Sequence, residues 1–267
     1  MKKIIVLLIS ALMVLGMTVT AYSADSITCW FPPGWKNKAD KARVIAKALG
    51  DNSGLQIRPR IAKSYPEILA AFSSDQQNLV YVGSFVQAII KARGLGSAMI
   101  QAQNGKEFYS GILVYPKGGD PSAILKNSPE KIAFAVGASS GESSAKAATG
   151  GKAAMGVANH GVACAAVVAG KAKAGVIKNW WWESNKGRFP TLAVYEIPNV
   201  SLKKNPDNVL TASKAIPVDI MLKVTAAAYN SKDAFGADNM APFDSDSLDF
   251  SLGLMQKGKI DPLAYTW

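Results

Sequence analysis

A short segment near the middle of the chain combines the residue types that bind an oxyanion. It reads Gly137-Ala-Ser-Ser-Gly-Glu-Ser-Ser144 and lies between an apolar run, residues 132–136, and an alanine-rich stretch. This order predicts a strand, a turn and a helix that begins near Ser143. The first N–H groups of a helix lack partners within it, and serine hydroxyls beside them add donors for a phosphate or phosphonate group. The candidate ligand-binding residues here are Ser139, Ser140, Gly141 and Ser143.

The same segment also fits a capping box at the start of the helix. In that arrangement the side chains of Ser139 and Glu142 each accept a hydrogen bond from the other residue's backbone N–H. A glutamate at this position would also repel an anion. Ser140 and Ser143 could still donate hydrogen bonds if Ser139 caps the helix, and the sequence leaves both interpretations open.

His160, the only histidine in the chain, opens a helical pattern that runs to about residue 169. A helix N-terminus disfavours the imidazolium and lowers the pKa of the histidine, while the neutral ring still donates one N–H. We expect His160 to bind the ligand. Cys164 lies one helical turn later on the same face, so a Cys–His pair of an exported thiol enzyme is an alternative. The apolar neighbours of Cys164 argue against it, and we predict no catalytic residue.

The histidine and cysteine content gives no sign of a metal or cofactor site. One histidine and two separated cysteines make no recognisable ligand cluster, so we predict no metal and no organic cofactor. Cys29 and Cys164 each lie in an apolar segment, as free cysteines that pack like small hydrophobic residues do. An oxidising compartment would permit a bridge, but we expect no disulfide to define the fold.

Aromatic residues lie at loop ends that should face a cleft. Tyr65, Phe85 and Tyr109 each lie next to the end of a predicted strand or helix, and tyrosine offers a flat apolar face with a hydroxyl. Trp35 follows a rigid Pro32-Pro33-Gly34 loop after the first predicted strand. Ligands of open α/β sheets bind beyond the carboxyl ends of the strands. We therefore expect these four side chains to enclose the ligand.

Trp180, Trp181 and Trp182 are consecutive. Three successive side chains cannot share one face of a strand or a helix, so at least one should be partly exposed. They could cover the core of a second lobe, or they could form an apolar wall for a ligand with ring or alkyl surface. The second interpretation keeps a sterol-like lipid as an alternative ligand.

The first residues have the order of a secretory signal. Lys2 and Lys3 precede an uncharged apolar run, residues 4–17, and small residues with cleavage points at 21–24 follow. We expect residues 1–24 to be a signal peptide and the protein to act in the periplasm. The formal net charge is +11, but the lysines are scattered. This charge suits an anionic ligand, and we expect no nucleic-acid binding.

Predicted strands and helices alternate along the chain, which is typical of an α/β fold with mainly parallel strands. Without the signal, 243 residues remain (267 minus 24), enough for two lobes. The Gly- and Pro-rich stretch 117–121 is the predicted hinge. We expect lobe 1 at residues 25–115, completed by about 214–267, and lobe 2 at 116–213. The predicted strands lie at 26–31, 55–61, 79–82, 108–115, 132–136, 174–177 and 192–197, with helices at 38–49, 66–72, 85–92, 160–169 and 247–256. Residues 216–229 are predicted to form a helix or a strand followed by a helix.

Several of these motifs, in this order, resemble the phosphonate-binding members of the ABC-transporter solute-binding proteins, which are type 2 periplasmic binding proteins. The similar segments are Tyr65-Pro-Glu-Ile-Leu-Ala-Ala-Phe72, Asn78-Leu-Val-Tyr-Val-Gly-Ser-Phe85, residues 105–114, Ala138-Ser-Ser-Gly141 and residues 159–175. The resemblance covers about residues 27–230. It implies a two-lobed α/β periplasmic-binding-protein fold with a ligand cleft between the lobes. It also implies an ABC permease in the inner membrane as the partner, and we expect a monomer.

Together these observations predict an exported, non-catalytic binding protein. We expect it to capture a small anionic ligand of the phosphonate, phosphite or phosphate-ester class and to deliver it to an ABC permease. Two alternatives remain. The same fold could bind a sterol-like lipid against the tryptophans, or the chain could be a thiol enzyme that uses Cys164 and His160.

Overall fold

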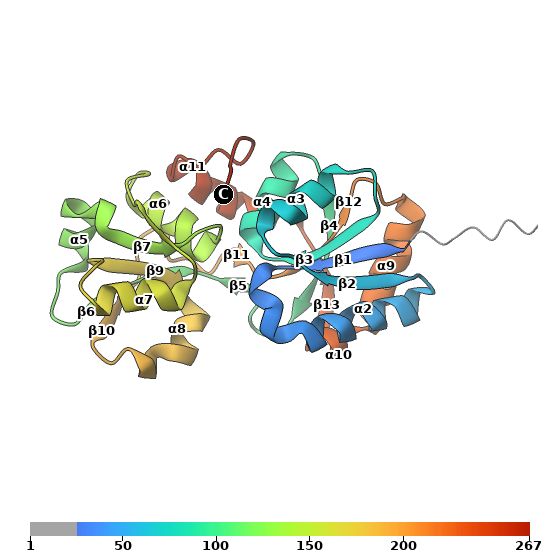
Figure 1. Cartoon of the computed structure of the whole chain (residues 1–267), viewed down its shortest axis with the longest axis horizontal. Helices are drawn as coiled ribbons and strands as arrows, with labels where there is room; N and C mark the ends of the chain where they lie inside the picture. Colours follow the sequence, from blue (N-terminus) through green and yellow to red (C-terminus); the bar gives the residue numbers. More distant parts are fainter. Residues whose placement is uncertain (1–25) are drawn as a thin grey trace, which may run out of the picture.

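The computed structural model describes residues 26–267, so the predicted signal peptide, residues 1–24, lies outside the described residues. Two α/β lobes lie side by side along the long axis of the molecule (Figure 1). Each lobe has its own sheet and its own hydrophobic cores. The expected two-lobed α/β fold is therefore confirmed. None of the helices in residues 26–267 combines the length and the hydrophobicity that a membrane span requires.

The first lobe contains a mixed six-stranded sheet in the order β13-β4-β12-β3-β1-β2. Strands β1, β2 and β3 run parallel, because a helix connects each of them to the next along the chain. Strand β12 pairs antiparallel with β3 and β4. These strands are β1 (Ile27–Phe31), β2 (Ile57–Ile61), β3 (Asn78–Val82), β4 (Gly96–Gln103), β12 (Val209–Ser213) and β13 (Asn239–Pro242).

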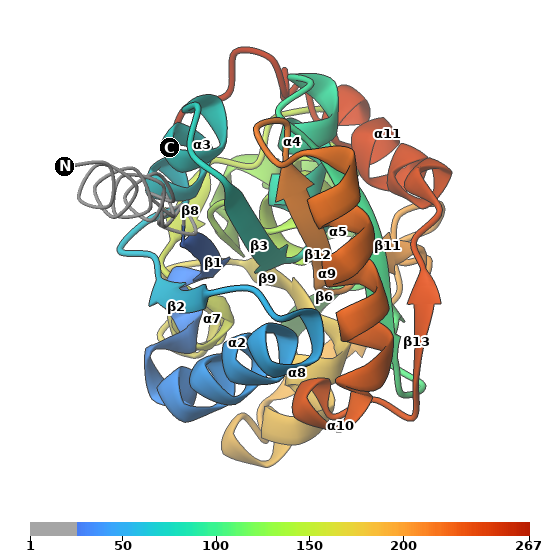
Figure 2. The ribbon, with the colours of Figure 1, turned by 90° about the vertical axis from the view of Figure 1, so that its right-hand side faces the viewer.

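Successive side chains of β1 point to opposite faces of this sheet, and a layer of helices covers each face. Cys29 and Phe31 lie in the core beneath one layer, and Trp30 lies in the core beneath the other. Figure 2 shows α2 and α10 on the opposite side of the sheet from α3 and α4. The helices of this lobe are η1 (Pro33–Lys38, a 3-10 helix), α2 (Ala39–Ser53), α3 (Tyr65–Ser73), α4 (Ser84–Ala92), α9 (Val218–Asn230) and α10 (Lys232–Phe235).

The second lobe contains a five-stranded sheet in the order β10-β6-β9-β7-β8. Its strands are β6 (Gly111–Pro116), β7 (Ile132–Ala135), β8 (Met155–Val157), β9 (Ala174–Lys178) and β10 (Leu192–Tyr195). Its α-helices are α5 (Pro121–Asn127), α6 (Ser144–Ala148), α7 (His160–Val168) and α8 (Asn179–Asn185), with 3-10 turns η2 (Pro129–Lys131) and η4 (Lys186–Arg188). Helices α7 and α8 pack on one face of the sheet, and α5 and α6 pack on the other. Cys164 is buried in this lobe and Cys29 in the first, and the two are free cysteines.

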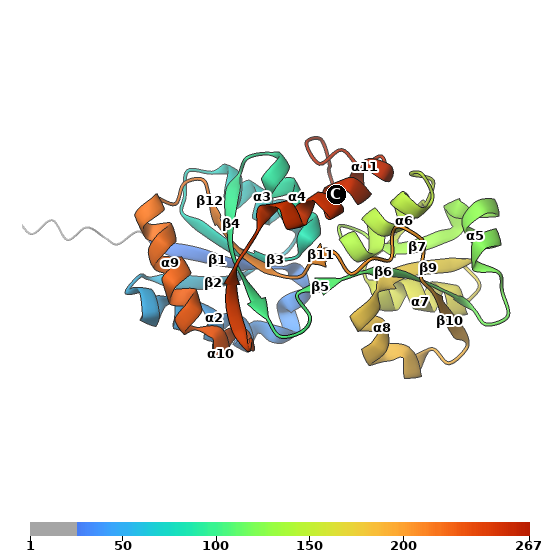
Figure 3. The same cartoon turned by 180° about the vertical axis from the view of Figure 1, so that it is seen from behind.

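The chain passes between the lobes twice, through a two-stranded antiparallel ladder of β5 (Phe108–Tyr109) and β11 (Asn205–Pro206) (Figure 3). Strand pairing assigns residues 111–116 to the second lobe and residues 209–213 to the first. Both assignments differ from the predicted boundaries after residues 115 and 213. The apolar pattern over 108–115 is continuous and predicts one strand, whereas the backbone divides at Ser110 into β5 and β6.

The predicted hinge, residues 117–121, lies inside the second lobe. It is a tight turn between β6 and α5, in which Gly118 has a φ of 84° and the Gly119 N–H donates to Pro116 O. Glycine adopts this left-handed conformation without strain. The glycines and the proline of residues 117–121 therefore indicate a turn within the second lobe. The crossovers between the lobes are the short strands β5 and β11, whose sequences lack this combination of glycine and proline.

The last elements connect the lobes. A 3-10 turn, η5 (Ser245–Leu248), leads into α11 (Asp249–Lys257), which packs against α6 of the second lobe and α4 of the first. Figure 1 shows α11 above the junction of the lobes. The remaining residues, 258–267, form what we call the C-terminal segment.

Candidate functional site

A cavity of about 160 Å³ lies between the two lobes. The first lobe contributes Pro32, Tyr65, Val82, Gly83, Phe85 and Val86; the second contributes Gly137, Ala138, Ser139, Ser140, His160 and Lys178. The crossovers contribute Tyr109, Asp207 and Asn208. Because both lobes and both crossovers line it, a ligand that fills this cavity contacts both lobes at once.

Two helix N-termini, one from each lobe, meet at the cavity. In the first lobe, α4 begins at Ser84 immediately after β3 and Gly83. In the second, a π-helical turn, η3 (Ser139–Ser143), leads into α6. Within residues 26–267, the backbone N–H groups of Phe85, Val86, Ser139 and Ser140 make no hydrogen bond. Such groups carry the positive end of the helix dipole and bind anions.

A chain of hydroxyl groups joins the lobes beside these N-termini. The oxygens of Ser84 and Tyr109 are 2.6 Å apart, and the Ser84 hydroxyl donates to Ser139 Oγ across the cleft at 2.9 Å. Ser140 Oγ lies 3.5 Å from His160 Nε2. Ser84 was not a predicted site residue, although its place at the start of a helix after a strand is the signal that singled out Ser139.

Glu142 does not form the capping box with Ser139. Its carboxylate accepts a hydrogen bond from the Gly137 N–H at 2.8 Å and one from the Tyr265 hydroxyl at 2.7 Å, and it pairs with Lys146 at 2.8 Å. The carboxylate is buried, is balanced by Lys146, and is not among the groups that line the cavity. The Ser139 hydroxyl is therefore directed to the interlobe hydroxyl chain, and the expected repulsion of an anion by Glu142 is offset.

Gly141 and Ser143 lie behind the cavity wall. A Cβ added to Gly141 would lie 2.7 Å from Ala135 O, so only glycine lets this turn pack directly on β7. The Ser143 side chain is fully buried, and its hydroxyl has no hydrogen-bond partner within residues 26–267. Neither residue lines the cavity. The serine-rich sequence thus predicted correctly that this turn lies at the cavity. The π-helical geometry of the turn determines that Ser139 and Ser140 line the cavity and that Gly141 and Ser143 do not.

His160 begins α7 and lines the cavity. Burial, with a smaller contribution from the charge of Lys178, lowers the pKa of His160 to about 4. The lowered pKa was expected, but desolvation is the larger cause. His160 Nδ1 is buried and has no hydrogen-bond partner within the described chain. Cys164 makes no hydrogen bond with His160, and burial raises the pKa of its thiol to about 12, which disfavours the reactive thiolate.

Lys178 and Asp207 were not predicted, and they form the charged part of the cavity. Lys178 ends β9, and its Nζ lies 2.7 Å from an oxygen of Asp207, which follows β11. The same Nζ lies 4.1 Å from the ring centroid of Tyr109 and 4.5 Å from that of Trp180. Lys178 is at the carboxyl end of a strand, where ligands of α/β sheets bind. No local sequence pattern indicates that Asp207 is a site residue, because its position at the cavity depends on the second crossover between the lobes.

The predicted aromatic residues divide into two groups. Tyr65, Phe85 and Tyr109 line the cavity. Trp35 does not: it is buried in the first lobe, with its ring centroid 5.1 Å from that of Phe31 and 5.8 Å from that of Tyr81. The 3-10 helix after β1 turns this side chain back onto the sheet and away from the cleft.

The three consecutive tryptophans lie on α8 and have three different surroundings. Trp182 is buried in the core, Trp181 lies between His160 and Phe189, and Trp180 contacts Tyr109 edge-on. None of the three lines the cavity. They therefore support the residues around the site, and they do not form an apolar wall for a lipid.

The C-terminal segment contacts both lobes at the edge of the cavity. Its carbonyl oxygens at Pro262 and Tyr265 accept hydrogen bonds from Arg93, the residue that follows α4, at 2.9 and 2.8 Å. The ring of Trp267 lies 5.6 Å from that of Tyr65, and its indole packs on Gly137 so closely that a Cβ there would collide with it. Tyr265 reaches Glu142 of the second lobe.

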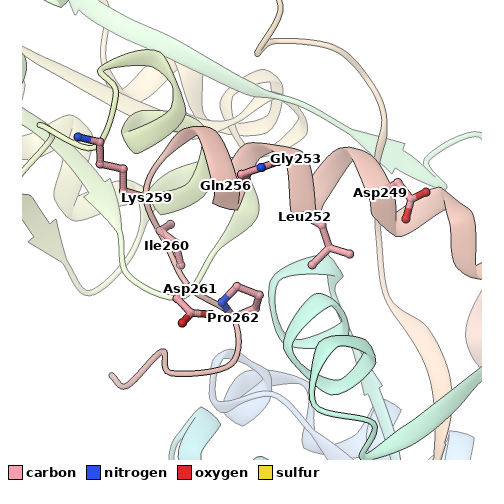
Figure 4. Close-up of a pocket in the computed structure, with 8 residues that line it drawn as sticks. All are labelled: Asp249, Leu252, Gly253, Gln256, Lys259, Ile260, Asp261 and Pro262. Atoms are coloured by element: carbon pink, nitrogen blue, oxygen red, sulfur yellow. The ribbon is translucent and has the colours of Figure 1, made fainter.

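A second, larger hollow of about 630 Å³ lies outside the cleft, along α11 (Figure 4). It is open, and the residues that line it belong to α11 and to the segment that follows: Asp249, Leu252, Gly253, Gln256, Lys259, Ile260, Asp261 and Pro262. It has no convergent buried polar groups, so the small cavity between the lobes is the better candidate for ligand binding.

A comparison with models of protein families identifies the family of this chain. The model of the family "ABC transporter, phosphonate, periplasmic substrate-binding protein" matches residues 37–232, more than half of the chain. The chain belongs to this family. It is thus a periplasmic solute-binding protein of the phosphonate type, which captures a solute and delivers it to an ABC permease. The resemblance inferred from the sequence motifs is confirmed.

Solved structures show the same fold at low sequence identity. PhnD1 from Prochlorococcus marinus, solved with methylphosphonate, has a TM-score of 0.68 and 16% identity over 89% of this chain and 100% of that chain. A binding protein component of an ABC phosphonate transporter from Pseudomonas aeruginosa has a TM-score of 0.64 and 14% identity, covering 87% and 88%. A Xanthomonas citri protein bound to ATP has a TM-score of 0.69 and 10% identity, covering 88% and 97%. No match was found among curated proteins.

Proposed function

We propose that this phosphonate-type binding protein holds a small phosphorus oxyanion, a phosphonate or phosphite, in the cavity between its lobes and releases it unchanged to the permease. The observation that carries the proposal is the meeting of two helix N-termini, from α4 and from η3, whose N–H groups have no partner in the described chain. A tetrahedral anion accepts hydrogen bonds from several directions, which suits donors that converge from both lobes.

The side chains around these N-termini support the same ligand. The hydroxyls of Ser84, Ser139 and Ser140 add donors, and a neutral His160 adds an N–H. A neutral histidine donates to an anion without fixing a permanent charge in a buried site. We expect the protein to act as a monomer in the periplasm, with no catalytic step and no nucleic-acid partner.

Cavity size argues for a small ligand. Sites for drug-sized molecules measure ~300–1,000 Å³, and this cavity measures about 160 Å³. A sterol-like lipid or ATP would therefore require a wider cleft than the described one. The thiol-enzyme alternative has no support from the geometry, because Cys164 is fully buried on the core side of α7 and does not line the cavity.

Isothermal titration calorimetry of the mature chain tests the proposal. The ligands are methylphosphonate, phosphite, inorganic phosphate, ATP and a sterol. We expect methylphosphonate or phosphite to bind with a Kd in the micromolar range or below, and ATP and the sterol not to bind. Binding of the sterol in the absence of oxyanion binding would overturn the ligand assignment.

Two variants in the same turn localise the site. Ser139→Ala removes a hydroxyl of the interlobe chain and should weaken binding by about 10- to 150-fold, because a hydrogen bond to a charged group contributes ~1.5–3 kcal/mol. Ser143→Ala is the matched control, since it removes a buried hydroxyl with no described partner behind the wall. Its Kd should match that of the wild type. Equal losses in both variants would mean that the turn acts only through its fold.

A further inference from the structure

The ammonium group of Lys178 is surrounded by groups that stabilise a cation. It lies 2.7 Å from a carboxylate oxygen of Asp207, over the face of Tyr109 at 4.1 Å and over the face of Trp180 at 4.5 Å. A carboxylate and two aromatic faces are the features that proteins use to bind ligand ammonium groups. In this chain they are already occupied by a side chain of the protein.

These groups belong to the ligand cavity. Lys178, Asp207 and Tyr109 all line it, and the Tyr109 hydroxyl lies 2.6 Å from Ser84 Oγ, at the start of α4. The charge of Lys178 also contributes to the low pKa of His160, which lines the same cavity. The side chains of Lys178 and Asp207 are 21% and 32% exposed, so the pair is mostly withdrawn from solvent.

We propose that Lys178 is a specificity-determining residue, which fills the position of a ligand amino group and so excludes aminoalkylphosphonates in favour of phosphonates without a cationic group. This inference rests on the proposed function. A ligand ammonium placed near Asp207 would share one carboxylate with Lys178, so two cations would face a single anion. A methyl or other small alkyl group carries no charge and meets no such repulsion.

Lys178 itself contributes little to holding the anion in this arrangement. Its charge is satisfied by Asp207, on the side of the cavity formed by the crossover, whereas the unpaired N–H donors lie at the helix N-termini. Anion binding and cation exclusion are therefore carried by different residues of the same cavity, and they are separable by mutation.

The test compares two ligands of equal heavy-atom skeleton, n-propylphosphonate and 2-aminoethylphosphonate, which differ only by a terminal methyl or ammonium group. By calorimetry, the wild-type protein should bind n-propylphosphonate at least tenfold more tightly. If the wild type binds the two equally, or prefers the amino compound, the inference is overturned while the proposed function stands. If it binds neither, nor methylphosphonate, the proposed function itself fails.

Lys178→Met and Lys178→Arg form a matched pair of variants. Methionine keeps the apolar length and removes the charge, so the Asp207 carboxylate loses its cationic partner, and the preference should reverse by at least tenfold toward 2-aminoethylphosphonate. Arginine keeps a cation in place and should retain the wild-type preference. Loss of both ligands in a folded Lys178→Met protein, checked by circular dichroism, would assign Lys178 to anion binding and overturn the inference. If Lys178→Met does not fold, the wild-type comparison alone decides.

Discussion

Ser139 and Glu142 show how one turn separates two roles that the sequence could not distinguish. Their spacing predicts reciprocal capping, which requires an α-helical first turn. The turn is π-helical, and this wider turn leaves Glu142 to accept from Gly137 and Ser139 to face the other lobe. Residue types alone identified a polar turn at a helix start. The wider winding, which no local pattern encodes, decided which hydroxyl reaches the cavity.

His160 gives a prediction at the same scale, about pH and stability. Its pKa is about 4 in the folded protein, below the ~6.5 of an unfolded histidine. Between these values the unfolded state binds more protons, so the free energy of unfolding falls as the pH drops from about 6.5 to 4 and is constant above that window. Over the full window the shift corresponds to about 3.4 kcal/mol.

Urea unfolding at pH 7.5 and pH 4.5 measures this effect. Carboxylates also titrate in this range, so the His160→Gln variant provides the reference. The wild type should lose about 2.5 kcal/mol more than the variant on acidification between these two pH values. Parallel losses in the two proteins would show that His160 is solvated in the folded state.

At the level of elements, the sequence predicts well what local pattern controls. The predicted helix over 160–169 is observed as His160–Val168, and the predicted strand over 132–136 as Ile132–Ala135. The two-residue strands β5 and β11 have no pattern of their own, because only their pairing across about a hundred residues of sequence defines them. The same crossover brings Asp207 to Lys178, which is why this pair escaped prediction.

The C-terminal segment yields a prediction about the coupling of the lobes. Tyr265→Phe removes the hydroxyl that donates to the buried Glu142 and keeps the ring that packs on Phe85. A hydrogen bond to a charged group is worth ~1.5–3 kcal/mol, so the free energy of unfolding should fall by about that amount. Urea denaturation measures it.

An exposed tyrosine provides the control for this experiment. Tyr229 lies on α9 with 40% of its surface exposed, and Tyr229→Phe should leave the stability unchanged. If Tyr265→Phe were as neutral as Tyr229→Phe, the segment would not hold the second lobe in solution.

For the whole molecule, the position of the cavity predicts that ligand binding and closure are one event. The ligand contacts both lobes, so it favours the closed arrangement over any open one. In small-angle X-ray scattering, the radius of gyration should decrease when saturating methylphosphonate is added. At a ligand concentration of a hundred times Kd, the free energy of unfolding should rise by ~2.7 kcal/mol. An unchanged radius of gyration at a saturation verified by calorimetry would contradict this.

The place of β12 has a consequence for how the protein is made. β12 follows the entire second lobe in the chain, yet it lies between β3 and β4 in the sheet of the first lobe. The second sheet draws all five strands from residues 111–195, so it can form as soon as that stretch has been synthesised. The first sheet needs β12 and β13 and so waits for residue 242, and pairing between such distant strands is slow. The lobe whose synthesis starts first is thus the one that finishes folding last, and the ligand site appears only at that final step.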